Sequence, residues 1–464
     1  MAVPRKTDTI AAVATPAGTG GIGIIRISGP DALAILRRIF RPQRGNLEKY
    51  RSHQLYYGSA VNRDQEILDE ILAVYMHAPA TYTREDVVEL HSHGSWLVLQ
   101  SILSEVFAAG ARPAEPGEFT KRAFLAGRID LTRAEAVIDL LQAKTEGGVR
   151  LAVGQLQGNM ESALTPVRDV LVRLLAVVEV AIDFPDDDVE ILDRESLRHQ
   201  LQESVIAPVG DLLHLADQGK VIREGVYVVI VGRPNVGKSS LLNGLLREER
   251  ALVTNIPGTT RDTIEEMIAI HGVPVHLVDT AGIHAHEDLV EALGIERARK
   301  KLREADLVLF MVDAHAGITG QDQELYRLVC KRNHLIVYNK MDLVAEEQLQ
   351  DLEKNFPGTE SVHLSARTGK GLEELQAAIY AQVVDCGREL EEHISCAPNV
   401  RHKAILSAML ETCRRLDQAL LAQIPADLLA VELQTALDCL MDITGVTTPE
   451  DVLEKIFSEF CIGK

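Results

Sequence analysis

The chain has 464 residues, of which 68 are Asp or Glu and 48 are Lys or Arg, so its formal net charge is −20. Because a single hydrophobic core rarely grows past about 250–300 residues, this length predicts several domains. The hydrophobic fraction of 46% excludes a wholly disordered chain. The acidity argues against a protein that coats nucleic acid through bulk positive charge.

Residues 1–120 alternate between short apolar runs and helical periodicity, which predicts a mixed α/β domain. Strands are expected at Thr9–Thr15, Gly23–Ser28 and Ile71–Met76, and helices at Asp31–Phe40 and Ser95–Ala109. This region holds 12 Lys+Arg against 13 Asp+Glu, whereas the other 344 residues hold 36 against 55. The negative charge therefore belongs almost entirely to the rest of the chain.

Two motifs of this first region resemble ligand sites. From Gly18 to Gly23 the chain matches the dinucleotide pattern G-x-G-x-x-G, but IGIIRIS predicts a strand there, so no helix N-terminus is available for a pyrophosphate. A glycine-rich turn near a ligand is the better interpretation. Glu89, His91 and His93 share one face of an expected strand. They form either a metal site or, as the lack of further ligands favours, a polar face that lines a ligand.

After residue 120 the pattern changes from helical to α/β and back. Residues 121–222 and 387–464 repeat apolar residues at three- and four-residue steps. Between them, VYVVIVG, VHLVDT, DLVLFMVDA and HLIVYNK are typical of strands buried on both faces of a mainly parallel sheet. The predicted fold is multidomain α+β: an N-terminal α/β domain (1–120), an all-α domain in two parts that pack together (121–222 and 387–464), and an inserted Ras-like α/β domain (223–386).

The cysteines and the N-terminus indicate a cytoplasmic protein. Six cysteines in this length are too few for a disulfide scaffold and show no C-x2-C spacing of a zinc site. The N-terminal MAVPRKTDTIAAV lacks the apolar core of a signal peptide, and no run of about 18 apolar residues occurs. We therefore expect no membrane span.

A phosphate-binding loop, G-x-x-x-x-G-K-S, runs from Gly232 to Ser239, after an expected strand and before an expected helix. In this context backbone N–H groups and the helix N-terminus bind phosphates. Lys238 would neutralise β- and γ-phosphate oxygens, and the Ser239 hydroxyl would bind Mg²⁺. An ordinary glycine-rich turn is the alternative.

Three further segments lie at expected strand ends and predict GTP as the nucleotide. In DTAG, Asp279 would face the nucleotide-bound Mg²⁺, and the Gly282 N–H would meet the γ-phosphate. In NKMD, the Asp342 carboxylate would accept hydrogen bonds from N1–H and the amine of guanine, a donor pair that adenine lacks. After SVHL, the loop at Ser365 and Ala366 would meet guanine O6. In order and placement these segments resemble the motifs of Ras-like GTPases.

Two segments leave alternatives open. TNIPGTTRDTIEE, between the phosphate loop and DTAG, is either a switch loop, in which Thr259 or Thr260 reaches Mg²⁺ and the γ-phosphate, or a Gly/Pro turn. The terminal CIGK fits prenylation poorly. Its Cys461 is either a free surface thiol or a functional thiol on a tail that reaches another site.

With these motifs in place, the whole chain resembles the MnmE (TrmE) family of tRNA-modification GTPases. DTIAAVATPAGTGGIGIIRISG resembles the N-terminal opening of the family, and EPGEFTKRAFLAGRIDLTRAEAVIDL and AIDFP resemble its helical domain. PGEFTKRAF and the terminal CIGK discriminate better than GRPNVGKSSLLN, which many GTPases share.

The resemblance implies a GTP-hydrolysing component of a complex that adds a (carboxymethyl)aminomethyl group to C5 of the wobble uridine of certain tRNAs. It implies a homodimer formed through the N-terminal domain, an FAD-dependent MnmG-type partner in a heterotetramer, and a 5-formyl- or methylene-tetrahydrofolate as one-carbon donor. The family binds folate through positions that match Arg26, Glu89, Arg128 and Lys464, so the N-terminal domain is expected to be folate-binding-like.

The family also implies potassium-activated hydrolysis. The matching K⁺ ligands are Asn235, Thr254, Ile256 and Thr259, and those for Mg²⁺ are Ser239 and Thr260. An acidic residue after DTAG, matched by Glu291, orients the attacking water, so Glu291, Lys238 and Cys461 are the expected catalytic residues. The expected GTP-binding residues are Asn235, Val236, Gly237, Lys238, Ser239, Ser240, Thr254, Asn255, Ile256, Pro257, Gly258, Thr259, Thr260, Asp279, Thr280, Ala281, Gly282, Asn339, Lys340, Met341, Asp342, Ser365, Ala366 and Arg367.

A regulatory GTPase of ribosome assembly is the alternative function. It explains the guanine motifs equally well. It does not explain the N-terminal half or the CIGK tail, and no basic RNA-binding module is appended.

Overall fold

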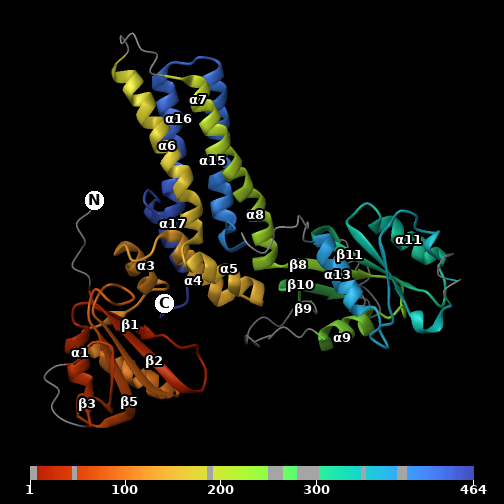
Figure 1. Cartoon of the computed structure of the whole chain (residues 1–464). Helices are drawn as coiled ribbons and strands as arrows, with labels where there is room; N and C mark the ends of the chain where they lie inside the picture. Colours follow the sequence, from red (N-terminus) through yellow and green to blue (C-terminus); the bar gives the residue numbers. More distant parts are fainter. Residues whose placement is uncertain are drawn as a thin grey trace, which may run out of the picture. The chain divides into compact units, whose positions relative to one another are not determined.

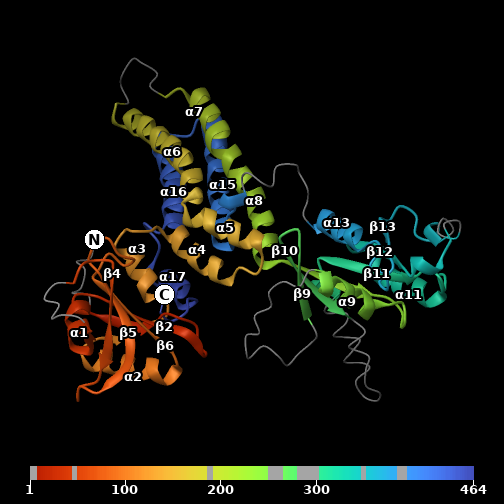
Figure 2. The same ribbon diagram turned by 60° about the horizontal axis from the view of Figure 1, so that its bottom comes forward.

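The structure is a computed structural model that describes residues 8–43, 50–184, 192–248, 265–279, 302–345, 348, 352–383 and 394–463. The chain divides into two compact units (Figures 1 and 2). The first unit joins Met1–Ile138 to Leu437–Lys464, and the second is Asp139–Ala436. None of the helices in the described ranges is both long and apolar enough to span a bilayer.

The first unit contains a seven-stranded sheet with the order β3-β4-β5-β6-β2-β1-β7. All neighbouring strands are antiparallel except β1 and β7, which are parallel. The strands are β1 (Ile10–Val13), β2 (Gly20–Ser28), β3 (Phe40–Pro42), β4 (Gln54–Val61), β5 (Ile67–Met76), β6 (Val87–Gly94) and β7 (Arg112–Pro113).

Helices α1 (Ala32–Ile39) and α2 (Trp96–Ala108) cover one face of this sheet. Because side chains alternate between the faces of a strand, Ile25, Ile27 and Leu90 are buried under the helices, whereas Arg26 and Glu89 lie on the opposite face. Strand β2 begins at Gly20, earlier than the predicted Gly23. The backbone of β2 at Gly20 lies so close to the end of β6 that a Cβ on Gly94 would meet the carbonyl oxygen of Gly20 at 2.4 Å.

Helices from both ends of the sequence complete the first unit. They are α3 (Glu118–Leu125), the first part of α4 (Leu131–Gln142) and α17 (Glu450–Ser458). Phe457, Phe460 and Leu131 form a buried cluster among them. Gly117 has a φ of 66°, and a Cβ there would meet the Phe457 carbonyl oxygen at 2.6 Å. The glycine of PGEFTKRAF is therefore required by this close approach.

The helical part of the second unit is built from chain segments on both sides of the inserted α/β region. Arg198 Nε donates to Asp417 Oδ1 at 2.9 Å, and Gln202 Nε2 donates to the same oxygen at 2.8 Å. Parts of the two helical pieces therefore pack together, whereas residues 121–138 and 437–464, predicted to belong to the same domain, lie in the first unit because their apolar side chains pack around Leu131 and Phe457. The helices are α5 (Glu146–Leu156), α6 (Asn159–Asp183), α7 (Arg194–Leu201), η1 (Gln202–Ile206), α8 (Ala207–Glu224), η4 (Ile394–Cys396), α15 (Val400–Leu421) and the first part of α16 (Ala426–Thr444).

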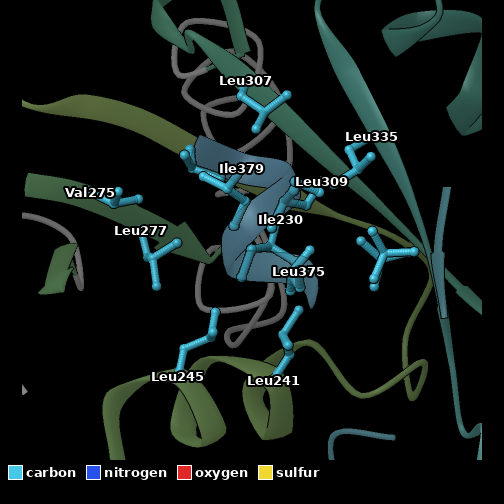
Figure 3. Packing of buried hydrophobic residues seen from close by; sticks show 14 of the residues in the cluster. Ile230, Leu241, Leu245, Val275, Leu277, Leu307, Leu309, Leu335, Leu375 and Ile379 are labelled. Atoms are coloured by element: carbon cyan, nitrogen blue, oxygen red, sulfur yellow. The ribbon is translucent and has the colours of Figure 1, made fainter. Parts of the chain in front are cut away.

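The inserted region contains a six-stranded sheet with the order β13-β12-β11-β8-β10-β9, parallel except for the β9–β10 pair. The strands that the apolar runs predict are buried on both faces, whereas the edge strands at Glu265–Ile270 and Ser361–His363 are only partly buried. One face packs against α9 and α13 through residues such as Leu241 and Leu375 (Figure 3), and the other packs against α11. The elements are β8 (Val226–Val231), α9 (Lys238–Glu248), β9 (Glu265–Ile270), β10 (Val273–Asp279), β11 (Leu307–Asp313), α11 (Gly320–Val329), β12 (His334–Asn339), η3 (Met341–Leu343), β13 (Ser361–His363) and α13 (Leu372–Val383).

Candidate functional site

The phosphate loop connects the carboxyl end of β8 to the first turn of α9. Lys238 is buried and folds back over the loop, where its Nζ donates to the carbonyl oxygens of Gly232 at 2.8 Å and Arg233 at 3.0 Å. Asn235 and Gly237 have φ values of 65° and 102°, a left-handed geometry that turns the loop around a concave set of backbone groups. This is the arrangement that binds phosphate in P-loop proteins.

Asn339 links the loop after β12 to the phosphate loop. Its Nδ2 donates to the Val236 carbonyl at 2.7 Å, and its Oδ1 accepts from the Ala366 N–H at 2.9 Å. A Cβ at Gly237 would meet Asn339 Nδ2 at 2.3 Å, so a glycine is needed there. The structure therefore brings together three segments that the sequence predicts to meet on one nucleotide.

The Asp342 carboxylate is exposed beside this junction, where a base can reach it. Its Oδ1 accepts a hydrogen bond from Ser365 Oγ at 2.7 Å. This contact orients the carboxylate and still leaves acceptor capacity on it. Arg367, which follows, is exposed.

An ion pair between Lys340 and Asp313 fixes the NKMD loop to the end of β11. Lys340 has a φ of 66°, and its Nζ lies 2.6 Å from Asp313 Oδ2. Burial would raise the pKa of Asp313. The hydrogen bonds from Lys340 and from the Ala316 and His315 N–H groups outweigh burial and bring that pKa below its usual value.

Sequence reasoning missed a buried support behind the phosphate loop. Asp322 on α11 is fully buried, and its Oδ2 lies 3.4 Å from Arg233 Nε in the loop. The same oxygen accepts from the N–H and hydroxyl of Thr319, and Arg233 also donates to the Gly317 carbonyl. The T-x-x-D spacing indicates only a helix cap, so the long-range contact with Arg233 has no local signal.

Several predicted residues lie outside the described residues. This applies to the expected switch segment, to DTAG after Asp279, to Glu291, the expected catalytic residue, and to the terminal Lys464. Asp279 is described only as the last residue of β10. The residues so affected are Thr254, Asn255, Ile256, Pro257, Gly258, Thr259, Thr260, Thr280, Ala281, Gly282, Glu291 and Lys464.

A second polar cluster lies on the open face of the N-terminal sheet. Arg26 Nε pairs with Glu89 Oε1 at 2.8 Å, across the β2–β6 pairing. His91 Nε2 is 3.5 Å from Glu89 Oε2 and is buried without a hydrogen-bond partner among the described residues. Contact with His91 and the charge of Arg26 hold the pKa of Glu89 below its usual range, although burial opposes this. His93 pairs instead with Asp69 at 2.7 Å.

Two aromatic rings border this cluster. The Arg26 guanidinium carbon lies 5.9 Å from the ring centre of Tyr82 and 5.8 Å from that of Phe119. Arg128 stacks over the same Tyr82 ring at 4.8 Å. Arg26 and Arg128, which the sequence places about a hundred residues apart, thus contact one aromatic side chain. In the part of the chain that the structure describes, no group of three His, Cys, Asp or Glu residues is placed to hold a metal ion.

The C-terminal tail reaches the same sheet face. The Gly463 carbonyl lies 3.5 Å from Arg26 Nη1, and Gly463 has a φ of 98°. A Cβ at Gly463 would meet the Val13 carbonyl oxygen at 2.2 Å, which explains the glycine of CIGK. Cys461, two residues earlier, is an exposed free thiol.

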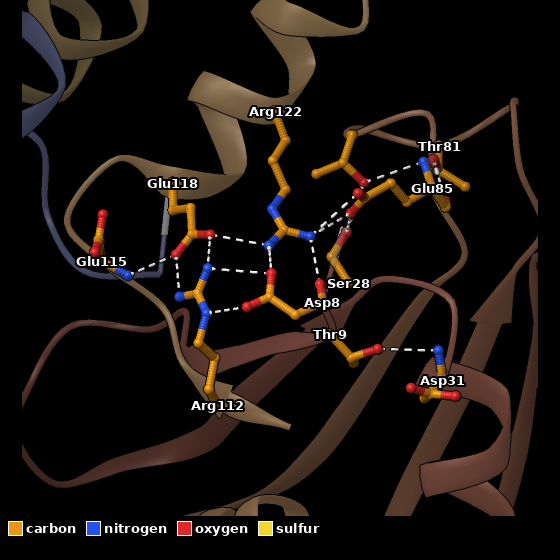
Figure 4. A network of polar contacts seen from close by, with 11 residues as sticks. Asp8, Thr9, Ser28, Asp31, Thr81, Glu85, Arg112, Glu115, Glu118 and Arg122 are labelled. Carbon is orange, nitrogen blue, oxygen red and sulfur yellow. Dashed lines mark hydrogen bonds and ion pairs between the residues drawn. The ribbon is translucent and has the colours of Figure 1, made fainter. Parts of the chain in front are cut away.

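An ionic network, buried at Arg122 and Glu118 and exposed at Asp8 and Arg112, supports the domain next to this site (Figure 4). Arg122 contacts Glu118 at 2.9 Å, Glu85 at 3.1 Å and Asp8 at 3.1 Å. Arg112 contacts Glu118 and Asp8, each at 2.5 Å. The network therefore joins the start of β1 and the loop before β6 to α3.

Comparisons with known proteins cover almost the whole chain. The model of the MnmE helical domain matches residues 131–461, and that of the GTP-binding protein TrmE N-terminus matches residues 9–128. The tRNA modification GTPase MnmE of Desulfotalea psychrophila is 52% identical over 464 residues, covering 98% of each chain. That of Geobacter sulfurreducens is 45% identical over 458 residues, covering 98% of this chain and 99% of the relative. That of Acetivibrio thermocellus is 43% identical over 460 residues, covering 99% and 100%.

Proposed function

Because the chain belongs to the MnmE family of tRNA modification GTPases, we propose that it hydrolyses GTP within a cytoplasmic complex that adds a (carboxymethyl)aminomethyl group to C5 of the wobble uridine of certain tRNAs. The observation that carries this proposal is the match to tRNA modification GTPases along nearly the full length of the chain. A match of that extent favours tRNA modification over ribosome assembly.

The GTP site is assigned to the junction of the phosphate loop, NKMD and the Ser365 loop. Lys238 and the Ser239 hydroxyl act on the phosphates and Mg²⁺, with Thr260 as the second Mg²⁺ ligand. Asp342 binds the guanine edge. The hydrogen bonds of Asn339 to Val236 and Ala366 support this assignment, since they hold the three loops together before the nucleotide arrives.

Hydrolysis is assigned to Glu291 as the residue that orients or deprotonates water, with K⁺ beside the β- and γ-phosphates. The cation ligands are Asn235, Thr254, Ile256 and Thr259. Asn235 has a left-handed φ, an uncommon backbone conformation that is concentrated at ligand sites. This conformation within the phosphate loop supports Asn235 as one of the cation ligands. A monovalent cation at this position adds positive charge where negative charge develops in the transition state.

The open face of the N-terminal sheet is assigned to a tetrahydrofolate, held by Arg26, Glu89, Arg128 and Lys464. The residues fit such a ligand. Glu89 can accept from the amino face of a pterin, and Tyr82 provides a flat surface. The buried Nε2 of His91, which has no hydrogen-bond partner among the described residues, is a polar group that a ligand would satisfy. The folate supplies the one-carbon unit when bound, and the role of these residues is to bind and orient it. Cys461 is assigned a catalytic role beside this ligand, which the contact of the Gly463 carbonyl with Arg26, two residues further along the tail, supports.

The same sheet face supports a homodimer through residues 1–120. Exposed apolar side chains on β4 and β5 lie next to the polar cluster on this face. In the strand pairing, Leu72 of β5 lies opposite Tyr57 of β4 and opposite His91 of β6. Leu55 and Tyr57 are 53% and 45% exposed, an apolar patch that a second copy would cover. Residues 223–386 carry GTP hydrolysis. Residues 121–222 and 387–464 supply the helices, of which those up to Ile138 and from Leu437 on belong to the compact unit of the N-terminal sheet. The further partners are the FAD-dependent MnmG-type protein, in a heterotetramer, and tRNA.

The decisive experiment is mass spectrometry of tRNA nucleosides from a strain that lacks the gene. We expect the wobble-uridine side chain to be lost, and the gene in trans to restore it. A strain complemented with Lys238→Ala should remain deficient if GTP binding is required. Unchanged nucleosides in the deletion strain would refute the role in tRNA modification.

The cation and the proposed catalytic residue are tested separately by GTP turnover. The rate in KCl should exceed that in NaCl at equal ionic strength, and equal rates would reject the K⁺ assignment. Glu291→Ala should slow turnover by about a hundredfold or more while GTP affinity stays close to that of the unmodified protein. Lost affinity would instead give Glu291 a structural role.

A further inference from the structure

A positively charged hollow lies beside the proposed folate site in the first unit. Its volume is about 500 Å³, and its lining includes His53, Tyr82, Arg84 and Arg128. None of the lining residues is Asp or Glu. In a protein with a net charge of −20, two arginines gathered in a hollow without a carboxylate form a local site for an anion.

Both guanidinium groups retain donors for a ligand. Arg84 Nη1 donates to the Ala126 carbonyl at 2.9 Å, and Arg128 Nη1 donates to the Tyr82 carbonyl at 3.1 Å. Each of these bonds occupies one of five N–H groups. Within the described ranges neither arginine forms an ion pair. The acidic residues nearest to Arg84 along the chain, Glu85 and Asp86, are held by Arg122 and by Tyr75 with His77. Asp130, which is nearest to Arg128, accepts from Thr132 Oγ1 and the Arg133 N–H.

The backbone at the rim of the hollow is held in an uncommon conformation. Arg84 and His53 have φ values of 59° and 62°, in the left-handed region that residues other than glycine seldom occupy. Such residues persist where surrounding contacts fix them, and they are concentrated at ligand sites. At Arg84, the bond to the Ala126 carbonyl supplies one of those contacts.

Tyr82 connects the hollow to the folate site, because its ring contacts both Arg26 and Arg128. If a folate is held by Arg26 and Glu89 and extends past Tyr82, the glutamates after its first would reach the hollow. We propose that Arg84 and Arg128 bind carboxylates of the γ-linked glutamate tail, so that the protein prefers folates with several glutamates to the monoglutamate. This inference rests on the proposed folate function.

The test compares two ligands by isothermal titration calorimetry on the full chain: 5-formyltetrahydrofolate with one glutamate and with three. We expect the triglutamate to bind about tenfold more tightly, the gain from a charge-assisted hydrogen bond in a partly exposed site. The gain should shrink when ionic strength rises from about 0.05 M to about 0.3 M, since salt screens exposed charges.

Arg84→Asn removes the guanidinium and keeps a residue that tolerates a left-handed backbone. It should leave the monoglutamate affinity unchanged and abolish the gain for the triglutamate. Arg63→Asn, at an exposed arginine that pairs with Glu105, is the matched control and should keep the gain.

If no folate binds at all, the proposed folate function fails. If the monoglutamate binds but the tail adds nothing, or if Arg84→Asn keeps the gain, only the tail site is refuted. Displacement of the tail by millimolar inorganic phosphate, with the monoglutamate affinity undisturbed, would show a general anion site and also overturn the assignment.

Discussion

The side-chain amide of Asn339 lies 2.7 Å from the carbonyl oxygen of Val236, so the NKMD loop, proposed to bind the base, also holds the loop proposed to bind the phosphates. Both partners are buried, Asn339 with 3% of its surface exposed and Val236 with 1%. A hydrogen bond in such a site is costly to leave unmade.

Asn339→Ala should therefore weaken GTP binding about ten- to a hundredfold, the equivalent of about 1.5–3 kcal/mol. The measurement is equilibrium titration with a fluorescent GTP analogue. Asn333→Ala, at an exposed asparagine just before β12, is the control and should leave the affinity unchanged. Equal effects of the two substitutions would mean that the link between the loops is unimportant.

Asp342→Asn should change the preferred base. An amide donates where the carboxylate accepts, so it opposes the donor edge of guanine and suits xanthine, which carries an oxygen in place of the amine. We expect GTP affinity to fall about a hundredfold and binding of xanthosine triphosphate to improve. Competition between the two nucleotides gives the ratio directly. A protein that loses both nucleotides equally would contradict the assignment of Asp342 to the base.

Asp322→Asn should destabilise the inserted α/β region by about 3 kcal/mol, because it leaves Arg233 without its buried partner. Thermal release of a bound fluorescent GDP analogue reports the loss as a lower midpoint. Glu324→Gln, at an exposed carboxylate of the same helix, should change the midpoint little. GTP affinity of Asp322→Asn should fall as well, since Arg233 lies in the phosphate loop.

The stability of the first unit should depend on acid through Glu118. Burial would raise the pKa of Glu118, but hydrogen bonds from Arg112, the Glu115 N–H and Arg122 bring it below the ordinary value of 4.5. A carboxyl with a lowered folded-state pKa stabilises the protein above its unfolded-state pKa. This contribution disappears as the pH falls from about 5 through the folded-state value.

Glu118→Gln should thus lower the free energy of unfolding at neutral pH by about 3 kcal/mol and flatten its decline below pH 5. Trp96, the only tryptophan of the chain, lies on α2 and reports unfolding of this unit by fluorescence. Glu115→Gln keeps the backbone hydrogen bond to Glu118 and should behave like the unmodified protein. If the stability of Glu118→Gln declines below pH 5 as steeply as that of the unmodified protein, other carboxyl groups control the loss of stability in acid.

Gly463→Ala should release the tail from the sheet, because its methyl group would collide with the Val13 carbonyl and its φ is left-handed. Hydrogen exchange of the backbone amides around Gly463 should become at least about tenfold faster. Gly110→Ala imposes a similar backbone strain at a φ of 120° where a Cβ would meet nothing within 4 Å. It should leave exchange in the tail unchanged, so a difference between the two isolates the contact with Val13.

Much of the fold could be predicted from local patterns. Strands β8, β10, β11 and β12 are buried on both faces, and their apolar runs predict this directly. The ends of the strands were harder to predict. β5 begins at Ile67, four residues before the predicted Ile71, because β4 pairs with residues that have no apolar pattern of their own. Pairing partners decide such boundaries, and they lie elsewhere in the chain.

The candidate sites divide in the same way. The motifs proposed to bind phosphate and guanine are short segments, and the sequence predicts them with their order. The supports behind them are not local. Asp322 reaches Arg233 over 89 positions of sequence, and Tyr82 brings Arg26 and Arg128 to one ring. Contacts of this kind depend on the completed packing, so no spacing rule predicts them.

The first unit is assembled from the two ends of the chain, and this has a consequence for biosynthesis. Gly117 packs against the Phe457 carbonyl, and Gly463 packs against that of Val13. During translation the N-terminal sheet emerges first, but the residues that complete its unit are synthesised last. The surface of the N-terminal unit that contacts α17 therefore stays uncovered until the GTPase segment and α17 have left the ribosome. Chaperones that bind the nascent chain should therefore contact mainly the surface that α17 later covers.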